Sequence, residues 1–226
     1  MNDTSSPLLD CVEIETGSEP RFSVIWMHGL GADGNDFVPI VPELKLGELG
    51  PLRFIFPHAP IQPVTINNGM SMRAWYDIYM ADLVRREDEQ GLRASQQLVE
   101  ALIARENARG IPTERIVLAG FSQGCAMALQ TGLRHPERLA GIIGLSGYLP
   151  LADLVDAERH AANADTPIFL AHGTMDPVVP FERAQASLEA LERMGYAVRF
   201  KTYPMPHSVC LEEIHDIAAF LREVIS

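Results

Sequence analysis

The alternation of short apolar runs with longer amphipathic stretches is the feature that most constrains the fold of this chain. The apolar runs are too continuously hydrophobic for strands with one solvated face, so they fit a parallel sheet that is buried on both sides. They lie at Phe22–Gly29, Leu52–Pro60, Ile116–Ser122, Leu139–Gly147, Thr166–Gly173 and Val198–Pro204. Apolar residues recur at helical spacing between and after them, most clearly in 94–108, 181–195 and 211–226. This alternation predicts a doubly wound α/β fold with helices on both faces of a mostly parallel sheet.

Residues 1–226 are expected to form one domain, because this length suits a single large core. Residues 1–20 precede the first predicted strand and are expected to be an N-terminal extension, either a strand or a poorly ordered segment. Residues 61–91 are expected to form a long loop with a short hairpin beside a functional site. Connections of that length usually have a function of their own.

The charge and cysteine content narrow the expected partners and location. The formal net charge is -12 at pH 7, a balance that repels nucleic acid and anionic membrane surfaces. No apolar run reaches the length of a membrane span, and the N-terminus lacks the features of a secretory signal. The 3 cysteines are an odd number without metal-ligand spacing, which indicates reduced thiols. We therefore expect a cytoplasmic protein that binds neither nucleic acid nor metal and is not integral to a membrane.

The motif GFSQG (120–124) follows an apolar run and precedes a helical pattern lined by small residues. A strand that turns into a helix within a few residues crowds the side chains two positions before and after the turn, and Gly120 and Gly124 relieve that crowding. The turn then exposes Ser122 at the carboxyl end of the strand and at the positive end of the helix. The pattern predicts a nucleophilic serine, although a tight turn that happens to contain serine has the same sequence.

A serine nucleophile needs a histidine base and a carboxylate that orients it, and on this type of fold the chain order is serine, acid, histidine. His207 follows the last predicted strand in the proline-flanked loop YPMPHSVC, where such a base belongs. His172 ends a strand and is expected to be a structural residue of that turn. The other downstream histidines are expected to be solvated: His135, His160 and His215.

The matching carboxylate is predicted to be Asp176, in the segment AHGTMDPVVP just past a strand. An Asp-Pro pair is also a common way to begin a turn. Asp153, Asp156 and Asp165 fit the order as well, but they lie in a polar connection rather than after a strand end. Asp176 is therefore the preferred acid.

The charge that develops on the substrate oxygen needs hydrogen-bond donors. One is expected to be the backbone N–H of Gln123, directly after the nucleophile. The second is expected in MHGLGADGNDF (27–37), where glycines let backbone N–H groups approach a ligand closely, and Leu30 is the candidate. An ordinary glycine-rich turn would look the same, but its occurrence with GFSQG, Asp176 and His207 in the required order favours an oxyanion hole.

Separated motifs from about Ser23 to the C-terminus resemble, in order, those of the phospholipase/carboxylesterase family, which includes bacterial carboxylesterases and acyl-protein thioesterases. They are HGLGADGNDF, FPHAP, RAWYDI, GFSQG, HGTMDPVVP and PHSV. The resemblance implies an α/β-hydrolase fold without a large cap domain and the same triad of Ser122, Asp176 and His207. It also implies that no metal or organic cofactor is needed, and that the loop carrying Trp75 shapes part of a substrate groove.

The candidate substrate-binding residues are Trp75, Met70 and Val179. An apolar cluster in 70–80 would suit an adaptable acyl site, and burial in the core explains the same residues equally well. The function expected is a serine carboxylesterase for short- to medium-chain acyl esters, acting as a monomer or homodimer on a small or lipid-like ester. An acyl-protein thioesterase or a lysophospholipase is the alternative on the same site. A non-catalytic binding module would be expected to lack a triad member, and none is missing.

Overall fold

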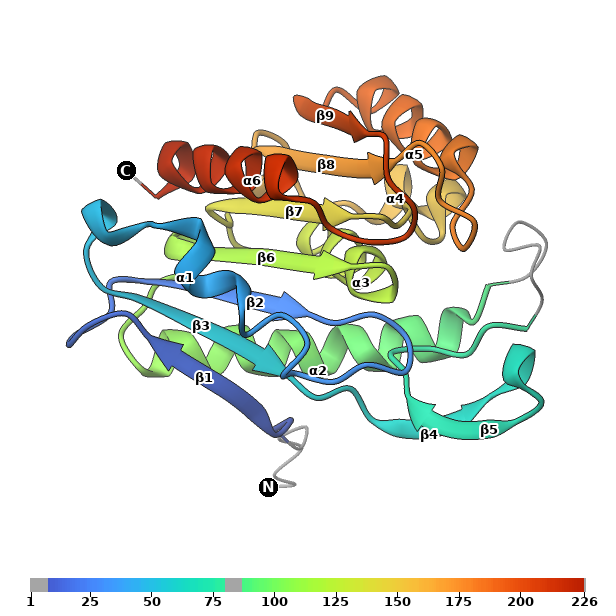
Figure 1. The fold of residues 1–226 in the computed structure, drawn as a ribbon, viewed down its shortest axis with the longest axis horizontal. Coiled ribbons are helices and arrows are strands. Elements are labelled where there is room, and N and C mark those ends of the chain that lie inside the picture. The colour runs from blue at the N-terminus through green and yellow to red at the C-terminus, as the bar shows by residue number, and fades with distance from the viewer. Residues whose placement is uncertain (1–7, 80–86, 226) are drawn as a thin grey trace.

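The computed structural model describes residues 8–79 and 87–225 and is built on a seven-stranded sheet in the order β1-β3-β2-β6-β7-β8-β9 (Figure 1). β1 pairs antiparallel with β3, and each other neighbouring pair is parallel. The strands are β1 (Cys11–Glu15), β2 (Phe22–Met27), β3 (Leu52–Pro57), β6 (Ile116–Phe121), β7 (Gly141–Leu145), β8 (Ile168–Gly173) and β9 (Val198–Tyr203). The predicted mostly parallel sheet is confirmed.

Helices cover both faces of the sheet. They are α1 (Ile40–Leu44), α2 (Glu89–Ala108), α3 (Gln123–Gly132), α4 (Ala152–Glu158), α5 (Phe181–Arg193) and α6 (Leu211–Val224). The buried residues of α2, α3, α4 and α5 join one hydrophobic cluster, and those of α1 and α6 join a second. Alternate residues of β2 belong to opposite clusters, with Ile25 in the first and Trp26 in the second. Burial on both faces explains why the strands are almost continuously apolar.

The six strands of the parallel part of the sheet, β2, β3, β6, β7, β8 and β9, lie within the apolar runs predicted from the sequence, and most of these runs extend into the adjoining loops. The N-terminal extension contributes β1, an edge strand whose Cys11 lies opposite Pro57. Residues 1–7 of that extension lie outside the described residues. The exposed side chains of Glu13 and Glu15 on this strand each form an ion pair with an arginine from another element.

The segment 61–91 begins with a two-stranded antiparallel hairpin, β4 (Ile61–Val64) and β5 (Met70–Arg73). The end of the range predicted as loop is helical instead, because α2 begins at Glu89. Asp88 caps this helix by accepting a hydrogen bond from the backbone N–H of Gly91 at 3.0 Å. A Cβ atom on Gly91 would lie 2.1 Å from the Asp88 carboxylate, so a side chain there would displace the capping group. Met80, the last residue of the apolar cluster predicted in 70–80, lies outside the described residues.

The parallel strands end at a common edge of the sheet, as Figure 1 shows, and the hairpin lies beyond that edge. Register pairs Met27 with Gly120, Phe121 with Leu145, and Gly173 with Tyr203. The loops that follow β2, β6, β8 and β9 therefore meet in one place. Within 8–79 and 87–225, no helix is long and apolar enough to cross a bilayer, and no three His, Cys, Asp or Glu side chains are grouped to hold a metal ion.

Candidate active site

Ser122 lies at the turn between β6 and α3 in a backbone conformation that is rare for a residue with a side chain. Its φ is 57° and its ψ is -115°, which strains an L-residue. Its backbone N–H donates to the carbonyl of Leu145, at the end of the neighbouring strand, at 2.9 Å. The turn thus has the strained strand-to-helix geometry that presents a nucleophile in hydrolases of this shape.

The two glycines of the motif allow this turn by permitting close backbone contact. A Cβ atom on Gly120 would lie 2.0 Å from the carbonyl oxygen of Gly124. A Cβ atom on Gly124 would lie 2.0 Å from the carbonyl oxygen of Met27, in β2. No side chain fits at either position, so the helix can begin directly against the sheet. This agrees with the crowding argued from the sequence.

Asp176 and His207 come together from the loops after β8 and β9. Nδ1 of His207 lies 2.6 Å from Oδ2 of Asp176. Oδ1 of the same carboxylate accepts the backbone N–H groups of Val178 and Val179 at 2.8 and 2.9 Å. The ring of His207 also lies 4.7 Å from that of Phe121, centroid to centroid, which brings the imidazole next to the residue before Ser122.

His172 faces the same carboxylate from the end of β8. Its Nε2 lies 2.9 Å from the carbonyl of Val179 and 3.5 Å from Oδ2 of Asp176. The side chain is buried, and burial lowers the pKa of this imidazole. A neutral His172 therefore holds the loop that carries Asp176. The sequence predicted a structural role for His172, and the structure adds that the ring lies next to the candidate acid, Asp176.

The remaining histidines and acids lie elsewhere. His160 and His215 are exposed, as expected, but His135 is buried, with its Nδ1 2.5 Å from a carboxylate oxygen of Glu100 on α2. The prediction that His135 is solvated is wrong, because a partner far away in sequence covers it. Asp153 and Asp156 are exposed on α4.

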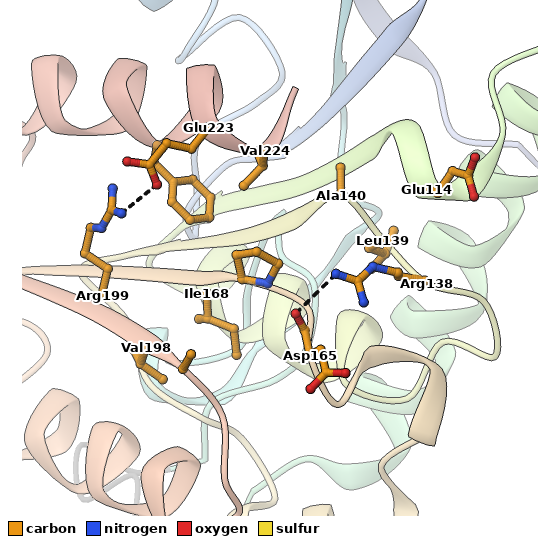
Figure 2. A pocket seen from close by; sticks show the side chains of 13 residues that line it. Glu114, Arg138, Leu139, Ala140, Asp165, Ile168, Val198, Arg199, Glu223 and Val224 are labelled. Carbon is orange, nitrogen blue, oxygen red and sulfur yellow. Dashed lines mark hydrogen bonds and ion pairs between the residues drawn. The ribbon is translucent and has the colours of Figure 1, made fainter. Parts of the chain in front are cut away.

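Asp165 lies at the opposite edge of the sheet, beside a cavity of about 790 Å³ at the start of β7, β8 and β9. Figure 2 shows Arg138 reaching the backbone carbonyl of Asp165 there, and Arg199 paired with Glu223. The cavity lining contains none of the candidate catalytic residues. A carboxylate at this edge cannot orient His207.

The candidate oxyanion donors flank Ser122. A Cβ atom on Gly29 would lie 3.2 Å from the Cβ of Ser122, so the loop that carries Leu30 runs against the serine. Gln123 is the first residue of α3, where backbone N–H groups have no partner within the helix. In the described part of the chain, neither the N–H of Leu30 nor that of Gln123 has a hydrogen-bond acceptor. Neither N–H is therefore engaged by another described group.

The candidate substrate-binding residues differ in their exposure. Trp75 is fully buried, and Val179 is buried with its backbone bonded to Asp176 and His172. Both side chains pack in the hydrophobic core, so a role for them in lining a substrate groove stays a prediction. Met70 is 65% exposed on β5. Its neighbour Met72 is half-buried, and its Sδ would lie 3.7 Å from a Cβ atom on Gly31.

Sequence reasoning missed His28, which directly precedes the loop of the second donor. The ring is buried, and burial lowers the pKa of His28. Nε2 accepts the backbone N–H of Ala59 at 3.1 Å, and Nδ1 lies 2.7 Å from the carbonyl of Gly29. Its place directly before the first glycine of HGLG was the only signal available.

Comparisons with known proteins cover most of the chain. The phospholipase/carboxylesterase family model matches residues 9–225. Acyl-protein thioesterase 1 of Neurospora crassa is 46% identical over an alignment of 212 positions, which covers 89% of this chain and 86% of that protein. The crystal structure of acyl-protein thioesterase 2 of Zea mays has a TM-score of 0.84 at 28% identity and covers 96% of this chain and 99% of its own. SOBER1 of Arabidopsis thaliana has a TM-score of 0.86 at 34% identity, with coverage of 91% and 100%.

Proposed function

Because this chain belongs to the phospholipase/carboxylesterase family of ester and thioester hydrolases, we propose that Ser122, His207 and Asp176 carry out its reaction through an acyl-enzyme. The observation that carries the proposal is the 2.6 Å contact of His207 with Asp176 next to the strained turn of Ser122. Nucleophile, base and orienting acid are what acyl transfer by a serine requires.

In the first half of the reaction, Oγ of Ser122 attacks the carbonyl carbon while Nε2 of His207 takes its proton. Asp176 accepts from Nδ1–H of His207 and so holds the tautomer in which Nε2 is free to act as a base. The imidazolium then gives the proton to the departing alcohol or thiol. In the second half, water attacks the acyl-enzyme with the same base, and Ser122 is restored.

The tetrahedral intermediates carry a negative charge on the former carbonyl oxygen. The backbone N–H groups of Leu30 and Gln123 are free to donate to it. Gln123 also begins the ten-residue helix α3, so the partial positive charge of the helix N-terminus lies at the developing oxyanion.

The substrate class is proposed as short- to medium-chain carboxylic esters, with S-acylated proteins as a second candidate. The second is favoured by the names of relatives such as acyl-protein thioesterase 1 of Yarrowia lipolytica, which is 40% identical and covers 97% of this chain. Both classes present an acyl carbonyl and a leaving group that needs one proton. They therefore fit the same set of residues.

A fluorophosphonate probe tests the mechanism directly. The wild-type chain should be labelled on Ser122, as mapped by mass spectrometry of the labelled peptide, and the S122A variant should not be. Hydrolysis of a p-nitrophenyl ester and of an S-acylated peptide by the same preparation separates the two substrate classes. Wild-type protein that takes no label would favour a non-catalytic binding module.

A further inference from the structure

Trp75 is bonded to both sides of the candidate oxyanion hole, although its side chain is buried. Its indole Nε1 donates to the carbonyl of His28 at 2.9 Å, two residues before Leu30. Its backbone N–H donates to Oε1 of Gln123 at 3.0 Å. One residue thus joins the loop that carries the first donor to the helix that begins with the second.

The loop side of this link is fixed by the ring of His28. The backbone N–H of Ala59 can only donate, so Nε2 of His28 accepts it and Nδ1 carries the proton that is given to the carbonyl of Gly29. In a trans peptide group the C=O and the following N–H point in opposite directions. Holding the carbonyl of Gly29 therefore sets the direction of the N–H of Leu30.

The helix side is fixed by the side chain of Gln123. Besides accepting from Trp75, it donates through Nε2 to the carbonyl of Tyr76 at 2.8 Å. The carbonyl of Trp75 accepts from the hydroxyl of Ser95 on α2. Each polar group of Trp75 thus has a partner, and the residue cannot shift without breaking bonds on both sides. Burial in the core makes such a shift more costly, because a hydrogen bond lost there is not replaced by one to water.

We propose that Trp75 is a positioning residue of the oxyanion hole, which sets the N–H groups of Leu30 and Gln123 relative to each other. This inference rests on the function proposed above. Oxyanion donors act by being held in place before charge develops. A small displacement of one donor weakens its bond to the oxyanion more than it weakens substrate binding, so the loss should appear in kcat and not in KM.

The variant W75F tests the proposal because it removes the indole N–H and keeps an aromatic ring. We expect kcat to fall roughly 10- to 100-fold, with KM changed by less than about threefold. This fall in kcat is smaller than the one expected when a whole oxyanion donor is removed. A trifluoromethyl ketone, which forms a hemiketal oxyanion on the serine, should lose affinity by the same factor as kcat/KM. A purely structural role would not produce this parallel.

The chain offers a matched control in Trp26. This tryptophan is also buried, but its indole N–H has no hydrogen-bond partner among the described residues. W26F therefore removes the same atoms without removing such a bond, and we expect kcat close to that of the wild type. If W75F loses no more kcat than W26F, or if its loss lies in KM alone, the proposal is overturned.

A second variant keeps the test valid if W75F does not fold. Q123M removes the side-chain bonds to Trp75 and Tyr76 but keeps the backbone N–H, and we expect the same selective loss of kcat and of ketone affinity. Unchanged kcat in Q123M would overturn the proposal. If the wild type itself takes no fluorophosphonate label, the proposed function fails and this inference fails with it. A labelled, active wild type with unaffected variants refutes only the role of Trp75.

Discussion

Asp176 accepts Nδ1–H of His207 on one carboxylate oxygen and two backbone N–H groups on the other. The carboxylate is fully buried and cannot rotate without losing these bonds. Its orientation therefore fixes the orientation of the imidazole. A third neighbour, His172, stands behind it at 3.5 Å. The geometry suits a carboxylate that directs a base and does not itself take up a proton.

D176N should leave the fold intact and reduce kcat by a factor on the order of 10⁴, because the amide donates to Nδ1 and favours the wrong tautomer of His207. The measurement is steady-state hydrolysis of a p-nitrophenyl ester, with circular dichroism to check the fold. D153N, D156N and D165N are the controls and should retain nearly full activity. A severe loss in one of these, with D176N active, would reassign the acid.

S122A and H207A should each lower ester turnover by several orders of magnitude, because nucleophile and base act as a unit. For the same reason the double variant should be little worse than either single variant. The four kcat values form a double-mutant cycle. Losses that multiply would show that the two residues do not act in one step, and His207 would no longer be the base.

A plot of kcat/KM against pH should show a single ionisation on its acid side. Turnover rises as His207 loses its proton, since only a neutral imidazole can accept the proton of the serine. Burial lowers the pKa of His28 and of His172, which disfavours a charge on either ring. The measurement is kcat/KM from pH 5 to 8 with chemistry shown to be rate-limiting. A flat profile, or two successive ionisations on the acid side, would contradict this assignment.

Much of the site could be predicted from the sequence because parallel strands end at one edge of a sheet. Ser122, Asp176 and His207 each follow a strand of this sheet, so the sequence alone predicted that they lie at the same edge. The strands themselves were evident because burial on both faces makes them continuously apolar. Their catalytic roles stay predictions until the variants are measured.

The rest depended on contacts that sequence patterns do not contain. The family resemblance and the apolar cluster in 70–80 placed Trp75 at a substrate groove, although burial in the core explained the same cluster equally well. Trp75 is buried in the core and bonded to His28 and Gln123, which are distant along the chain. His135 was misassigned for the same reason, since Glu100 lies on another helix.

Glu213 should make the wild-type protein less stable as pH rises. It is buried in the first turn of α6, and burial raises its pKa from 4.5 to about 8. Between these values the folded state binds more protons than the unfolded state, so the free energy of unfolding falls with rising pH and levels off above pH 8. The total is a few kcal/mol, at about 1.4 kcal/mol per pKa unit. E213Q should lack this slope in urea denaturation from pH 5 to 9, whereas E212Q, at an exposed neighbouring position, should keep it.

Acyl-chain preference should be determined by the hairpin and not by the ring of Trp75. Met72 is half-buried next to Gly31, beside the loop of the candidate donor Leu30, and a flexible thioether there would suit acyl chains of several lengths. Each buried methylene contributes roughly 0.8 kcal/mol, or about fourfold in kcat/KM. We expect kcat/KM for p-nitrophenyl esters to climb from acetyl toward medium chains and then to level off.

Two variants separate the roles in this series. M72A should flatten the climb and leave acetyl ester turnover nearly unchanged, because only longer chains would reach the methionine. W75F should lower every ester by the same factor, because the oxyanion is common to all of them. A wild-type series that declines steadily from acetyl onward would rule out an apolar acyl site at the hairpin. It would leave the hydrolase chemistry of Ser122 standing, because that chemistry does not depend on chain length.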